Sequence, residues 1–156
     1  MDLVPELGLD ILKSLAILGD DVTAQLRTEL GKLKDPVRLA VFSAALADPD
    51  SEQVKRLVEE LAALSPLLSA ESYNFVLDKE KVEALKIARI PAIVVLGAEK
   101  DYGIRMYGVP SGYEFRTLLD AILDVSSGDS GLTAETRAAL GELQQPVHVQ
   151  VFSTPT

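Results

Sequence analysis

Few side chains in this sequence are able to carry out covalent chemistry. The chain of 156 residues contains no cysteine and a single histidine, His148. Without cysteine there is no thiolate nucleophile, no disulfide and no zinc–thiolate site, and one histidine cannot build a multi-histidine metal site. The single histidine also disfavours a Ser-His-Asp triad. We assign His148 no role, because it falls at an outward position of an expected strand.

Carboxylates are the remaining candidates for acid–base or metal chemistry. Asp48 and Asp50 could suggest a metal site, but the solvated start of a helix explains them better, and we expect no metal. The Glu59–Glu60 pair is expected on a solvated helix face. No pair of carboxylates has the one-face spacing that would support a hydrolase. Glu114 is the carboxylate that we single out, since it falls in the first turn of the last expected helix, where the helix dipole favours negative charge.

Composition narrows the class of protein further. The 24 Asp and Glu residues outnumber 15 Lys and Arg, giving a net charge of −9 that disfavours nucleic acid as a partner. The hydrophobic content of 47% allows one globular domain with an aliphatic core. No apolar run approaches the ~20 residues of a membrane span, and the acidic amino end is unlike a secretory signal. We therefore expect a cytoplasmic protein without a membrane or nucleic-acid partner.

An internal repeat at an offset of 110 residues organises the chain. The stretch TAQLRTELGKLKDPVRLAVFS from Thr23 and the stretch TAETRAALGELQQPVHVQVFS from Thr133 share eleven of 21 aligned residues. Each copy reads as an amphipathic helix capped by its threonine, a turn with proline, and a buried strand. Because the second copy stops at Thr156, directly after its strand, we expect one complete unit followed by the first strand of a second, truncated unit.

The segment between the two copies supplies the remaining elements. Apolar spacing predicts helices over 51–65, 79–88 and 112–126, with Asp50 or Ser51 as N-cap of the first. Strands are expected at 73–77, at 90–96 and, after a turn at 101–103, at the sheet edge over 104–108. The order is β-α-β-α-β-β-α, preceded by one or two helices. This order predicts an α/β fold with a small mixed sheet, in which the first two strands are parallel and the last two form a hairpin.

Three segments give this order a family resemblance: PVRLAVFS, then RIPAIVV, then GIRMYGVPSGYEF. They resemble the thioredoxin/glutaredoxin fold, and in particular two proteins with tandem thioredoxin-like units. One is the glutaredoxin-like protein disulfide oxidoreductase of thermophiles, and the other is the N-terminal domain of the alkyl hydroperoxide reductase flavoprotein. The resemblance implies a redox-inactive thioredoxin-like unit over 21–127, and a linker helix and the first strand of a truncated second unit over 128–156. It does not cover residues 1–20, which we take as an N-terminal extension.

The same resemblance indicates which positions of this chain correspond to the cysteines of the relatives. In the relatives, a strand sequence like VFSTPT leads into the CxxC motif of the second unit. At an offset of 110, those two cysteines correspond to Ala47 and Asp50 of this chain. Thiol–disulfide exchange requires a thiolate, so the resemblance implies a redox-inactive, degenerate CxxC position here, and we expect the chain alone to have no reductase activity and no cofactor.

The remaining implications of the resemblance concern support and binding. Glu114 corresponds to a carboxylate close to the second unit's CxxC, where it could exchange a proton, although it could also simply cap its helix. Pro91, which follows Ile90, corresponds to the cis-proline that borders a peptide groove, but we expect its role here to be structural rather than functional. The chain would be a non-catalytic scaffold for a tandem oxidoreductase acting on a peroxiredoxin or on protein disulfides. The alternative is a non-catalytic module that binds extended peptides.

Overall fold

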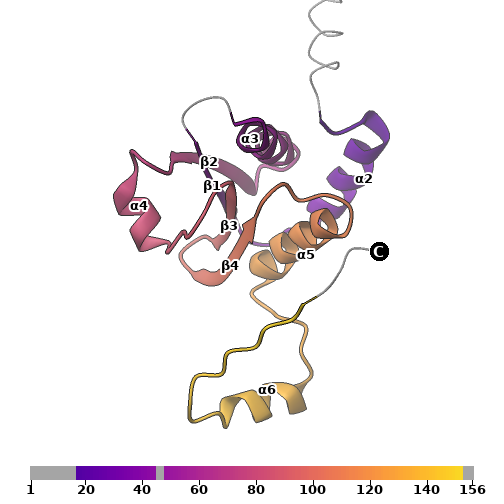
Figure 1. Ribbon diagram of the computed structural model, residues 1–156. Coiled ribbons are helices and arrows are strands. Elements are labelled where there is room, and N and C mark those ends of the chain that lie inside the picture. The colour runs from indigo at the N-terminus through magenta and orange to yellow at the C-terminus, as the bar shows by residue number, and fades with distance from the viewer. Residues whose placement is uncertain (1–16, 45–47, 153–156) are drawn as a thin grey trace, which may run out of the picture.

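The computed structural model describes residues 17–44 and 48–152 of the protein (Figure 1). Ala47 and residues 1–16, which include most of the expected N-terminal extension, lie outside the described residues. In chain order the elements are α2 (Asp20–Leu30), β1 (Val37–Ser43), α3 (Pro49–Ala62), β2 (Leu68–Asn74), α4 (Lys79–Ala84), β3 (Ala92–Gly97), β4 (Asp101–Tyr107), α5 (Tyr113–Ser127) and α6 (Ala134–Gly141).

The described strands form one four-stranded mixed sheet in the order β2-β1-β3-β4. Strand β1 pairs in parallel with β2, while β3 is antiparallel to both β1 and β4. The expected order β-α-β-α-β-β-α, the parallel first pair and the C-terminal hairpin are all confirmed. The central strand β1 is buried from Val37 to Phe42 except for Arg38, because its apolar residues face cores on both sides of the sheet.

The two faces of the sheet are covered unequally (Figure 1). On what we call the α3/α5 face, side chains of α2, α3 and α5 pack over alternate residues of β1 and β3. On the opposite face, called the α4 face, a smaller cluster forms around Phe42 and Val94, against Ile87 and the partly buried Val82 and Leu85 of the α4 region. The Phe42 ring stacks on Tyr73 at 5.2 Å between centroids. The six-residue helix α4 is thus the principal cover of this second face.

Several predicted boundaries were wrong for local reasons. The strand expected at 73–77 is instead β2, over Leu68–Asn74, because pairing with β1 outweighs the apolar run at Phe75–Leu77. The turn expected at 101–103 is already part of β4, which pairs with β3 from Asp101 through an irregularity at Val95/Leu96. Thr23 caps no helix, since α2 begins earlier, after Gly19. By contrast, Thr133 does cap α6, accepting a hydrogen bond from the amide of Thr136 at 3.2 Å.

Glu60 has a structural role that differs from the expected solvated one. Its two carboxylate oxygens accept hydrogen bonds from the backbone amides of Ile17 and Leu18, at 2.8 and 2.9 Å. The segment that leads into α2 is thereby attached to α3. Because both donors are backbone amides, the side chains around residue 17 form no pattern that could have indicated this contact.

The C-terminal repeat copy differs from its N-terminal counterpart. No strand is formed over 145–152, where we expected one at Val147–Val151, and Val147, Val149 and Phe152 are 64%, 75% and 89% exposed. A strand requires a hydrogen-bonded neighbour, and the described residues place none beside this segment. The corresponding residues of the first copy, Val37, Leu39 and Phe42, are completely buried.

Ser126 joins the last helix of the unit to the entry of β1. Its hydroxyl accepts hydrogen bonds from the amides of Lys34 and Asp35, at 2.9 and 3.0 Å, and donates one to the carbonyl of Asp35 at 2.7 Å. The serine is 1% exposed, so its hydroxyl is shielded from water. This single hydroxyl therefore bonds to three backbone groups at the entry of β1.

We predict that Ser126→Ala lowers the free energy of unfolding by about 1–3 kcal/mol, because it removes the hydrogen bonds that the hydroxyl makes to the amides of Lys34 and Asp35 and to the carbonyl of Asp35. Urea denaturation monitored by circular dichroism measures the change. Ser130→Ala is the control, since Ser130 is exposed, and it should change stability by less than about 0.5 kcal/mol. Equal stability of Ser126→Ala and the wild type would contradict this role.

Candidate functional site

Most of the candidate residues lie at one end of the sheet. The ends of β1 and β4 and the start of β3 meet there, because Phe42 pairs with Ala92 and Ala92 pairs with Tyr107. The chain leaves β1 toward the start of α3 at this end, and it leaves β4 toward the start of α5. The register of the sheet thus places the Asp48–Asp50 segment, Pro91 and the β4–α5 connection at the same end.

The start of α3 includes Asp50, one of the two positions at which the resemblance predicts a degenerate CxxC. Asp48, not Asp50 or Ser51, is the N-cap residue. Pro49 is the first helical residue, a position whose amide makes no intrahelical hydrogen bond, so a proline costs nothing there. Ser51 is buried, donates its hydroxyl proton to the carboxylate of Asp48, and accepts a bond from the amide of Ala44 at 3.3 Å. Asp50 is exposed. This arrangement closes the β1–α3 connection with polar groups that have no redox chemistry.

The Ile90–Pro91 peptide bond is cis. Pro91 is buried and Ile90 is partly buried. The carbonyl of Pro91 accepts a hydrogen bond from the amide of Gly108 at 2.9 Å, which extends the pairing of β3 with β4 by one residue. Tyr107 covers the loop before the proline: its hydroxyl accepts a bond from the amide of Ala88, and the Arg89 guanidinium lies 4.8 Å from its ring centroid.

Arg105 holds the segment that leads to Pro91, and sequence reasoning did not single it out. Its guanidinium donates to the carbonyl of Leu85, from Nε at 3.1 Å and from Nη2 at 3.0 Å, and makes two 2.6 Å bonds to the carboxylate of Asp101. The side-chain bond from Arg105 lowers the pKa of Asp101 to about 2, and the amide of Gly103 also contributes to the lowered pKa. No sequence signal indicated this pair, because Asp101 was expected in a turn and Arg105 in the strand that follows it.

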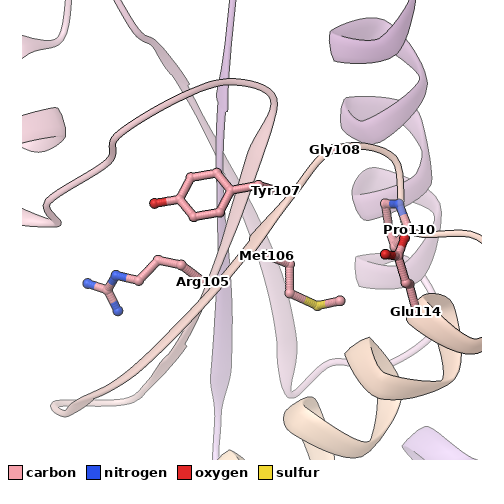
Figure 2. Close-up of a pocket in the computed structure, with 6 residues that line it drawn as sticks. All are labelled: Arg105, Met106, Tyr107, Gly108, Pro110 and Glu114. Atoms are coloured by element: carbon pink, nitrogen blue, oxygen red, sulfur yellow. The ribbon is translucent and has the colours of Figure 1, made fainter. Parts of the chain in front are cut away.

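Glu114 lines a hollow of about 220 Å³ at the start of α5, together with Arg105, Met106, Tyr107, Gly108 and Pro110. Figure 2 shows the Glu114 carboxylate beside Pro110, with Met106 directed to the same side and Arg105 and Tyr107 to the other. Glu114 is exposed and makes no side-chain hydrogen bond among the described residues. Gly112, at φ +51°, lets the chain turn into α5 in a backbone conformation that other residues rarely adopt. The expected place of Glu114 in the first turn of the last helix is confirmed.

Other sequence candidates do not join this site. His148 is exposed in the C-terminal segment. Within residues 17–44 and 48–152, no group of three or more potential ligands, the Asp48–Asp50 segment included, could hold a metal ion. In the same ranges no helix is long and apolar enough to cross a membrane.

Sheet order, strand directions and helix positions together define the class: an α/β unit of thioredoxin-like fold. No family model matches the sequence. Comparison with solved structures finds a protein disulfide oxidoreductase from Aeropyrum pernix K1 with a TM-score of 0.71 and 30% identity, covering 83% of this chain and 58% of that one. The N-terminal domain of alkyl hydroperoxide reductase AhpF from Enterococcus faecalis gives a TM-score of 0.70 and 27% identity, covering 78% and 58%.

Among curated proteins, the alkyl hydroperoxide reductase protein AhpF of Staphylococcus aureus is 32% identical over 111 residues, which are 70% of this chain and 19% of that protein. The chain spans about a fifth of the length of the curated relatives that it matches. The resemblance read from the sequence is therefore confirmed: the chain is similar to protein disulfide oxidoreductases and to the N-terminal domain of AhpF, but it contains no cysteine.

We predict a pH-dependent contribution of Asp101 to stability. Its pKa is lowered in the folded protein from an ordinary 3.8 to about 2, so the stabilisation is complete above about pH 4 and is lost as the pH falls toward 2. Because the carboxylate is 37% exposed, solvent screening limits the contribution to about 1 kcal/mol. Asp101→Asn should therefore be less stable than the wild type at pH 7, and the difference should shrink at pH 2.

Urea denaturation of both proteins between pH 7 and pH 2 measures this difference. The matched control is Asp120→Asn, which removes the exposed Arg116–Asp120 pair on α5 and should change stability by less than about 0.5 kcal/mol. A stability difference for Asp101→Asn that stays constant over the whole pH range would contradict the assignment.

Proposed function

We propose that this chain is a redox-inactive thioredoxin-like unit that supports the CxxC of a second thioredoxin-like unit in the same parent protein. The observation that carries the proposal is chemical: the fold of a disulfide oxidoreductase is present, but Asp48, Pro49 and Asp50 stand at the start of α3 and the chain has no thiol. Exchange requires a thiolate that attacks a disulfide. A domain that has the fold but lacks the nucleophile can still position a neighbouring unit.

The internal repeat supports a second unit. The C-terminal copy exposes Val147, Val149 and Phe152, whose counterparts 110 residues earlier form the buried central strand. A strand with this apolar alternation is stable when it pairs with strands on both sides and when helices cover both of its faces. We infer that residues 145–152 are the first strand of a second sheet. The Aeropyrum protein extends well beyond the matched region, since this chain covers 58% of it.

The parent protein would pass electrons as a dithiol/disulfide pair to a peroxiredoxin or to protein disulfides, in the cytoplasm. Within it, Glu114 is the residue of this unit that we assign to proton exchange near the CxxC. Its carboxylate is accessible, it lines the hollow beside Gly108 and Pro110, and no described residue holds it in an ion pair. An accessible carboxylate is able to exchange protons with a neighbouring thiol during reaction.

A second candidate function is non-catalytic binding of extended peptides at the Ile90–Pro91 loop. The observation in its favour is that the loop is held from several sides, by Arg105, Tyr107 and Gly108. A preformed loop reduces the entropy lost when a peptide binds. Peptide binding would shift backbone amide resonances around Ile90 in the chain alone, whereas the scaffold function requires no such ligand.

The scaffold function is tested in the parent protein that contains the second unit. We predict that Glu114→Gln slows dithiol oxidation and shifts its pH profile, because an amide cannot take up or release the proton. Glu83→Gln, an exposed position on α4, is the matched control and should leave rate and profile unchanged. A coding sequence that provides no CxxC downstream would overturn the scaffold function, and an unchanged pH profile in Glu114→Gln would overturn the role of Glu114.

A further inference from the structure

The connection between α5 and α6, residues 128–133, is closed by its own hydrogen bonds, and we call it the elbow. Its first part is attached to the end of α5, because the hydroxyl of Ser127 accepts a bond from the amide of Asp129 at 3.1 Å. The carboxylate of Asp129 in turn accepts a bond from the amide of Gly131 at 3.0 Å. Gly131, at φ +67°, turns the chain in a backbone conformation that other residues rarely adopt. The elbow therefore has a defined shape.

Arg137 of α6 connects the two ends of the elbow. Its Nε donates a hydrogen bond to the carbonyl of Leu132 at 2.8 Å, and its Nη2 pairs with the carboxylate of Asp129. The planar guanidinium makes both bonds in one fixed geometry. The amide of Gly131 and the side chain of Arg137 both lower the pKa of Asp129, so this carboxylate is charged at neutral pH. One side chain of α6 thus contacts both the early and the late part of the connection.

The internal repeat shows that these bonds belong to the connection and not to the repeated pattern. Arg27, the counterpart of Arg137 in the first copy, is exposed on α2 and makes no side-chain hydrogen bond among the described residues. Helix α2 begins at Asp20, whereas α6 begins at Ala134, whose counterpart is Ala24. The elbow therefore stands where the first copy has the first turn of its helix.

Packing does not hold α6 against the rest of the unit. All residues of α6 are exposed, and Figure 1 shows the helix set apart from the sheet. Beneath the elbow lies a hollow of about 340 Å³, which Arg137 lines together with Tyr102 and Val125. Because no core contact fixes the direction of α6, the bonds of the elbow determine it.

We propose that Arg137 is the positioning residue for the second unit: by holding the elbow closed, it fixes the direction in which α6 and residues 145–152 leave this unit. The purpose of this device rests on the proposed function, but its geometry does not. A flexible linker lets two domains adopt many orientations, and a fixed geometry lowers the entropic cost of bringing reacting groups together. A closed elbow would hold the second unit in a restricted set of orientations relative to Glu114.

The elbow is tested on the full chain by double electron–electron resonance, which is convenient because the chain contains no cysteine of its own. Spin labels are attached at Asp120→Cys on α5 and Ala139→Cys on α6, two exposed positions outside the elbow. We expect a narrow distribution of distances between the labels. Adding Arg137→Ala removes both bonds but keeps a good helix former in α6, and should widen the distribution about twofold or more, toward that of a flexible linker.

Arg27→Ala is the matched control, because it removes the repeat counterpart of Arg137 and should leave the distribution unchanged. Gly131→Ala opens the elbow without changing its charge: no atom lies within 4 Å of the added Cβ, so the substitution strains only the backbone at φ +67°. It should widen or shift the distribution as well.

A distribution that is already broad in the labelled parent chain, or one that Arg137→Ala and Gly131→Ala both leave unchanged, would overturn the proposal. Circular dichroism confirms that each variant is folded. Because the measurement uses this chain alone, its result does not depend on whether a CxxC follows, which is the test of the proposed function.

Discussion

The burial of β1 between two strands and under two cores is the constraint on which the rest of the structure depends. Its backbone pairs with β2 on one side and with β3 on the other, and its side chains alternate between the α3/α5 face and the α4 face. The positions of the candidate residues at the Pro91 end of the sheet follow from this register. The start of α3, Pro91 and the β4–α5 connection meet because β1 ends where β3 begins. Ser126 secures the other end of the same strand.

The chain has a thioredoxin-like fold but no thiol. The sheet order β2-β1-β3-β4 and the helix positions are those of the fold, whereas the sequence contains no cysteine. At the start of α3, Asp48, Ser51 and the amide of Ala44 are joined by hydrogen bonds. None of these groups can carry out thiol–disulfide exchange, which requires a thiolate.

Predictions from the sequence were most successful for elements whose apolar pattern reflects a buried face. The alternation in β1, the apolar run of β3 and the helical spacing in α3 and α5 all correspond to buried faces. It failed where a backbone group or one side chain decides the outcome. Strand β2 is half-exposed, so it has no clear apolar alternation, and the bonds of Glu60, Ser126 and Arg105 to backbone groups leave no periodic signal. Glu114 was located correctly because helix starts favour carboxylates.

A disulfide-exchange assay measures the central claim most directly. The chain and its Ala47→Cys/Asp50→Cys variant are compared in the dithiothreitol-driven reduction of insulin, after circular dichroism has confirmed that both are folded. The account predicts no catalysis above the uncatalysed rate for the wild type, and measurable catalysis once cysteines are introduced at positions 47 and 50. Insulin reduction by the cysteine-free wild type would contradict it.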